Sequence, residues 1–143
     1  PAHIILRYEI EKGLINGDIE AEDIPHLWDE KMIQLIGIST KGKFCDGPMQ
    51  DVHWPEGLFG YFPCYTLGAI YAAQWKAMIQ LEHSNFDDIV GKENLNSIFH
   101  WLDENIWKNA SKKSTDKLTT DASQGSALNV AHFKNHLESR YLC

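Results

Sequence analysis

The side chains best suited to chemistry gather in one stretch of the sequence, residues 47–65. Asp51 and His53 lie two positions apart, so on an extended loop they point the same way and the carboxylate could orient the imidazole. Tyr61 and Tyr65 lie four positions apart at the expected start of a helix, which puts both phenols on one face. An imidazole and phenols that converge are good neutral hydrogen-bond donors for a developing oxyanion. The alternative interpretation is that these rings only pack the loop against a helical core.

Two other sets of side chains are weaker candidates. His132 and His136 have the i,i+4 spacing of a helical two-histidine metal site, but Phe133 stands where an HExxH motif carries its Glu, and no third ligand is obvious. We interpret this pair as a solvated helix face. Cys64 lies at an expected helix start, a setting that can activate a thiol, so a cysteine hydrolase is a further alternative.

The cysteine pattern argues against a structural zinc site. The three cysteines are Cys45, Cys64 and Cys143, and none of them forms a CxxC pair. Reduced thiols in a cytoplasmic protein are the simplest interpretation of this pattern.

Apolar periodicity predicts an all-α fold that positions these groups. Asp23 is expected to cap the second helix, and glycine and proline indicate a long, ordered, aromatic loop over residues 38–63. The sequence also allows a short β-hairpin near residues 43–51. Residues 111–125 are polar and are expected to form an extended surface connection. The expected helices cover residues 3–14, 23–36, 64–81, 94–110 and 127–142, with a short helical turn over 85–90.

Length and composition limit the class of protein. The 143 residues suit one domain, and 43% apolar with 23% charged residues are ordinary for a folded globular chain. Thirteen Lys and Arg residues against 20 Asp and Glu give a net charge of −7, which argues against nucleic-acid binding. No stretch is long and apolar enough for a transmembrane helix, so no membrane partner is expected.

Six segments of the sequence together resemble the carboxypeptidase Taq family, whose members are zinc- or cobalt-dependent metallocarboxypeptidases. The most specific of these is GPMQDVHW at residues 47–54, which fits the family's GxxQDxHW motif. Cys64 and Pro55 depart from the family pattern, because members often carry small polar residues there. The resemblance covers nearly the whole chain and is weakest over residues 111–125. The matching segments are residues 3–12, 14–18, 23–28, 47–54, 57–68 and 71–74.

The resemblance implies that residues 1–143 are a single C-terminal helical portion of a larger peptidase domain, with an active-site loop over residues 42–63. His53 and one of Tyr61 or Tyr65 would then be catalytic donors to the oxyanion, a choice that spacing leaves open. Gln50 and Asp51 would contact the substrate or hold the loop.

The family's HExxH and IRxxAD motifs do not occur in this sequence, so the resemblance implies no metal ligand here. Zinc or cobalt would be the cofactor of the intact enzyme, while the isolated chain would be inactive and bind none. The expected partners are a peptide substrate, the N-terminal half of the peptidase and a second copy in a homodimer. A non-catalytic helical interaction module or an inactive remnant is the alternative.

Overall fold

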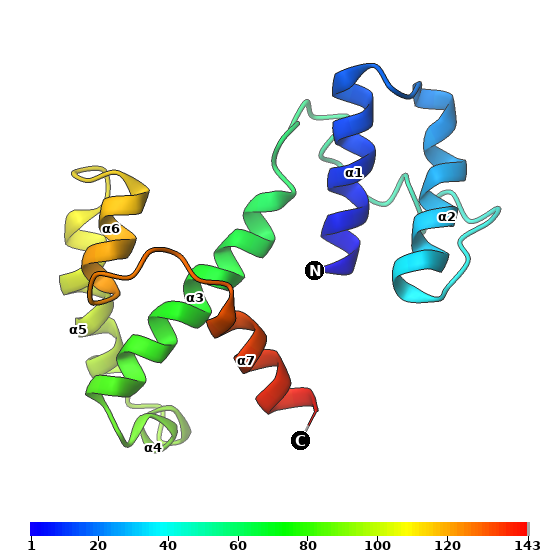
Figure 1. Ribbon diagram of the computed structural model, residues 1–143. Helices are drawn as coiled ribbons and strands as arrows, with labels where there is room; N and C mark the ends of the chain where they lie inside the picture. The colour runs from blue at the N-terminus through cyan, green and yellow to red at the C-terminus, as the bar shows by residue number, and fades with distance from the viewer. Residues whose placement is uncertain (143) are drawn as a thin grey trace. The chain divides into compact units, whose positions relative to one another are not determined.

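The structure is a computed structural model that describes residues 1–142. These residues contain helices and no strands, as the all-α prediction requires (Figure 1). They divide into two compact units, residues 1–67 and the residues from Gly68 onward, and the boundary falls within the helix α3 (Pro63–Glu82). Each unit has its own hydrophobic core. The expectation of a single helical portion over the whole chain stays a prediction.

The first unit begins with a helical hairpin. The helices α1 (Ala2–Asn16) and α2 (Ile24–Ile36) run side by side, and the short 3-10 helix η1 (Ala21–Asp23) precedes α2 (Figure 1). Both α-helices end where expected, because Gly17 and Gly37 take the left-handed conformation, with φ of 74° and 79°. The core between them is built from Leu6, Ile10, Trp28 and Met32.

The predicted cap of α2 is only half right. Asp23 occupies the position before the helix, but its side chain makes no capping bond to α2. Its Oδ2 instead accepts from the backbone N–H of Glu20 at 2.9 Å and so closes a capping box around η1.

Residues 37–62 form the long loop, which lies between α2 and α3. The suggested hairpin near residues 43–51 is wrong, because this stretch forms local turns. The N–H groups of Gly47 and Met49 both bond back to the carbonyl of Phe44, which is a bond within a turn and not a bond across to a second strand. Asp29 on α2 holds the start of the loop, since its Oδ1 accepts from Ser39 Oγ at 2.7 Å and from Thr40 N at 2.6 Å.

The second unit contains most of α3 and the later helices. Its core consists of Ile79, Trp101, Ile106 and Ala122. The buried side-chain amide of Gln74 on α3 holds the segment that follows residue 122. Its Nε2 donates to Ser123 Oγ, and its Oε1 accepts from Asn129 N. The helices after α3 are α4 (Phe86–Gly91), α5 (Asn96–Asn105), η2 (Trp107–Asn109), α6 (Thr115–Ala122) and α7 (Ala131–Tyr141).

The expected extended connection over residues 111–125 is wrong. These residues contain the helix α6, whose first turn is capped by Ser114 through a bond from Lys117 N at 3.3 Å. A helical pair between Lys117 and Asp121 supports it, so a segment poor in apolar residues is still helical.

None of the described helices combines the length and the apolar character that crossing a bilayer needs.

Candidate active site

An open hollow of about 280 Å³ on the first unit brings several of the candidate residues together. Asp51, His53 and Tyr65, three of the five candidate residues, line it. The hollow lies beside α1, and aromatic and charged groups form its walls. Its full lining is His3, Ile4, Arg7, Asp51, His53, Phe62 and Tyr65.

His53 and Tyr65 are directly bonded. The Nε2 atom of His53 lies 3.0 Å from the hydroxyl oxygen of Tyr65, and the two rings meet edge to face. Both groups can donate or accept, so the direction of this bond follows from the imidazole tautomer. The loop supplies His53 and the first turn of α3 supplies Tyr65, which joins the two elements at this point.

Tyr61 lies close to the pair but is bonded to neither member. Its ring centroid is 5.6 Å from that of His53 and 5.5 Å from that of Tyr65. The Tyr61 side chain does not line the hollow. Of the two tyrosines that spacing left equivalent, Tyr65 is the one whose hydroxyl meets the imidazole.

Asp51 does not orient His53 in the predicted way. Its Oδ1 is 4.0 Å from His53 Nδ1, which is too long for a hydrogen bond. Nδ1 is buried and has no hydrogen-bond partner among the described residues. The Asp51 carboxylate instead accepts from Arg7 Nε, with 2.5 Å between Oδ2 and Nε.

Gln50 lies outside the hollow. Its side-chain Nε2 donates to the carbonyl oxygen of Gly47 at 3.0 Å, which closes a turn within the loop. This bond fits the part of the prediction in which Gln50 holds the loop.

Arg7 is the first residue that sequence reasoning missed. Its side chain is 7% exposed, and besides Asp51 it bonds the carbonyl oxygen of His3 at 2.8 Å and His3 Nδ1 at 3.0 Å, both through Nη1. The guanidinium carbon also lies 4.7 Å from the centre of the Trp28 ring. A basic residue next to the buried Leu6 was the available signal, since a charge on the core side of a helix needs a partner.

Glu11 is the second missed residue, and it holds the loop on the other side of His53. Its carboxylate accepts from Trp54 Nε1 at 2.8 Å and from the backbone N–H of Gly60. Arg7 and Glu11 have the i,i+4 spacing of a helical charge pair, but both bond to the loop. His53 is thus held between an anchor at Asp51 and anchors at Trp54 and Gly60.

His3 also lines the hollow, where it is largely exposed. Burial is the largest cause that lowers the pKa of His3, and the charge of Arg7 lowers it further. The carboxylate of Asp51 acts in the opposite direction. The imidazole therefore stays neutral to lower pH than an ordinary histidine.

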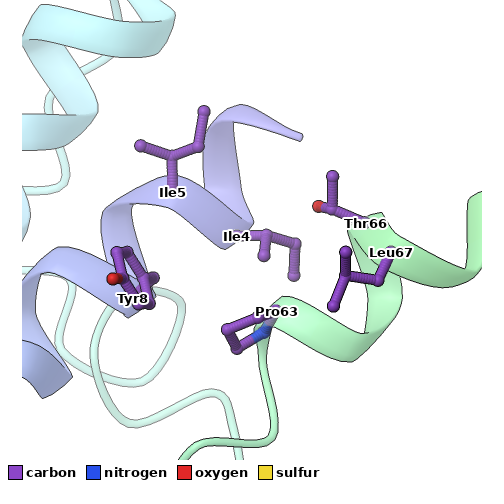
Figure 2. A pocket seen from close by; sticks show the side chains of 6 residues that line it. All are labelled: Ile4, Ile5, Tyr8, Pro63, Thr66 and Leu67. Carbon is purple, nitrogen blue, oxygen red and sulfur yellow. The ribbon is translucent and has the colours of Figure 1, made fainter. Parts of the chain in front are cut away.

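A second, apolar hollow of about 330 Å³ lies nearby (Figure 2). Ile4, Ile5 and Tyr8 from α1 face Pro63, Thr66 and Leu67 from the start of α3 across it. Ile4 belongs to the walls of both hollows. The polar groups therefore have an apolar surface directly beside them.

The described residues do not provide a site for a catalytic metal. Between Pro1 and Leu142, no group of three or more His, Cys, Asp or Glu side chains could hold a metal ion. His132 and His136 line a separate hollow of about 310 Å³ in the second unit.

Comparison with known proteins defines the class. Residues 1–141 match the model of a family described as carboxypeptidase Taq (M32) metallopeptidase. The chain belongs to this family.

Carboxypeptidases are among the proteins that this chain is similar to. Carboxypeptidase 1 of Bacillus subtilis is 38% identical over 99% of this chain, and thermostable carboxypeptidase 1 of Pyrococcus furiosus is 33% identical over 98%. Among solved structures, metallocarboxypeptidase 1 of Trypanosoma cruzi is 44% identical, with a TM-score of 0.95 over 100% of this chain. The chain spans only 28% of each of the two curated relatives and 30% of that solved chain.

Proposed function

We propose that the intact protein is a metal-dependent carboxypeptidase that removes C-terminal residues from peptides, and that residues 1–67 bring donors to the reacting carbonyl. Membership of the family supports the reaction class. The observation that carries the role of this chain is the 3.0 Å contact between His53 Nε2 and the Tyr65 hydroxyl at the edge of an open hollow.

The pair acts by stabilising charge. When a nucleophile adds to the scissile carbonyl, negative charge develops on the carbonyl oxygen, and fixed N–H and O–H donors lower the energy of that state. A neutral His53 that carries its proton on Nε2 donates to the Tyr65 oxygen, which leaves the Tyr65 O–H free for the substrate. In the other tautomer Tyr65 donates its own proton to Nε2, so the Tyr65 O–H is not free for the substrate.

The surroundings of His53 favour the Nε2-protonated form. A proton on Nδ1 would have its nearest carboxylate oxygen 4.0 Å away, beyond hydrogen-bond distance. That carboxylate is already bonded to Arg7. We therefore assign Tyr65 rather than Tyr61 as the phenol that donates to the oxyanion.

The remaining candidates take supporting roles. Asp51 lines the hollow and is proposed to contact substrate while it anchors the loop to Arg7. Gln50, which closes the turn at Gly47, is proposed as a second contact. The residues that bind the zinc or cobalt ion are expected in polypeptide outside this chain, so the isolated chain should be inactive.

The test is made in the full enzyme that contains this chain. His53→Ala should lower kcat by about 10²–10³ with the bound metal unchanged, because the Tyr65 hydroxyl then loses the imidazole that leaves its O–H free for the oxyanion. His26→Ala, on an exposed part of α2, is the matched control and should leave kcat unchanged. Loss of metal in His53→Ala would instead make His53 a ligand or a structural support and overturn the assignment.

A non-catalytic interaction module is the second candidate, favoured by the apolar hollow. Ile5, Tyr8 and Leu67 in its walls are each more than 40% exposed, and apolar surfaces of this kind drive association. Gel filtration of the chain separates the candidates, because a module should form a complex that dissociates on dilution. A monomer at every concentration would count against it.

A further inference from the structure

We propose that His3 is a further hydrogen-bond donor to the peptide substrate, acting through its Nε2–H in the hollow that holds His53 and Tyr65. The proposal rests on the proposed function, since it adds a residue to the same site. The ligand group it fits is an oxygen acceptor of a peptide, either a backbone carbonyl or the terminal carboxylate.

The contact with Arg7 fixes the tautomer of His3. Arg7 Nη1 lies 3.0 Å from His3 Nδ1, and a guanidinium has only donors. Nδ1 must therefore accept, so it carries a lone pair. A neutral imidazole has one N–H, and with Nδ1 occupied as the acceptor the proton has to sit on Nε2.

A second bond makes this arrangement rigid. The same Nη1 donates to the carbonyl oxygen of His3 at 2.8 Å, so Arg7 holds both the backbone and the ring of this residue. Arg7 is in turn held by Asp51 and by the face of the Trp28 ring. The ring of His3 is thus oriented by a buried group that is itself held at two further points.

The charged groups around His3 keep it neutral. The charge of Arg7 on the same helix opposes protonation of His3, while Asp51 from the loop favours it. Burial of the ring is the largest effect and also lowers the pKa of His3. The neutral donor form therefore persists below the pH at which an ordinary histidine becomes charged.

The donor edge of the ring is open to a ligand. No group in residues 1–142 accepts a hydrogen bond from His3 Nε2, and the residue is exposed where it lines the hollow. Tyr65 lines the same hollow, so one peptide could accept hydrogen bonds from both the Tyr65 O–H and His3 Nε2.

Three variants of the full enzyme test the role with an N-acetylated trialanine peptide as the probe. His3→Gln places an amide N–H near the position of Nε2, whereas His3→Asn places its amide near Nδ1 and His3→Ala removes the group. We expect KM to rise about 3- to 10-fold in His3→Asn and His3→Ala, with kcat little changed, as for loss of one neutral hydrogen bond. His3→Gln should restore KM to within about twofold.

A nitrogen-15 NMR measurement of the His3 ring in the same enzyme tests the tautomer without any activity. At neutral pH the spectrum should show Nε2 protonated and Nδ1 bare, and Arg7→Met should restore a mixture of tautomers. Protonation at Nδ1, or an unchanged KM in His3→Asn, would overturn the proposal. If His53→Ala left kcat unchanged, the proposed function would be overturned instead. The nitrogen-15 spectrum of His3 would not change in that case.

Discussion

Arg7 Nε and Asp51 Oδ2 lie 2.5 Å apart and join the first helix to the loop two residues before His53. The two residues are separated by 44 positions in the sequence. This ion pair holds the loop before His53, and the bonds that Glu11 accepts from Trp54 and Gly60 hold the loop after it. The position of the proposed catalytic histidine therefore depends on two buried charges in α1.

The Arg7–Asp51 pair should matter for stability far more than a surface pair. Arg7→Met leaves the Asp51 carboxylate without its partner, and we expect a loss of about 2–4 kcal/mol in the free energy of unfolding. The control is Lys31→Met, which breaks the exposed pair with Glu9 and should cost at most about 1 kcal/mol. Urea unfolding of both variants checks the difference, and equal losses would contradict a special role for Arg7.

The glycine at the start of the GPMQDVHW segment is required by packing. A Cβ on Gly47 would lie 2.9 Å from the carbonyl oxygen of Lys43, so the backbone must shift. We expect Gly47→Ala to lower the free energy of unfolding by about 1–3 kcal/mol.

Gly68 provides the matched control for Gly47. It lies inside α3 and has no atom within 4 Å of the position its Cβ would take. Gly68→Ala should therefore raise the free energy of unfolding by about 0.5–1 kcal/mol, because alanine favours the helix. If Gly47→Ala and Gly68→Ala changed the free energy of unfolding in the same direction, the packing explanation for Gly47 would be contradicted.

Asp29, which holds the start of the loop, should titrate below its ordinary range. The hydrogen bond from Ser39 is the largest cause that lowers the pKa of Asp29, and the Thr40 backbone N–H adds to it. The folded state thus binds its proton less tightly than the unfolded state. The stabilisation is present at neutral pH and is lost as the pH falls through the lowered pKa.

Carbon-13 NMR of the carboxyl groups measures this directly. Ser39→Ala should move the Asp29 midpoint upward, towards the ordinary value. The midpoint of Asp121, whose pKa is lowered by Lys117 and Lys113, should stay where it is. An unchanged Asp29 midpoint would show that Ser39 is not the cause.

Local chemistry made part of this structure predictable. Gly17 and Gly37 end their helices because glycine takes the left-handed conformation there without strain. The GxxQDxHW segment indicated which loop carries the candidate site. The helix α6 was not predicted because its apolar pattern is short and its composition is polar. Its capping serine and its i,i+4 charge pair were the local signals for a helix.

Other features depend on contacts that no local spacing contains. The loop partners of Arg7 and Glu11 lie more than 40 positions away in the sequence, so these bonds follow only from the folded loop. Tyr61 and Tyr65 share a helical spacing, and only the position of the His53 ring distinguishes them.

The most direct test of the central claim compares two single-oxygen deletions in the full enzyme. If the hydroxyl bonded to His53 stabilises the oxyanion, Tyr65→Phe should lower kcat by about 10²-fold with little change in KM. Tyr61→Phe, whose ring packs against the same imidazole, should stay within about threefold of the parent. Equal kcat values for the two variants, or a loss confined to Tyr61→Phe, would contradict the account.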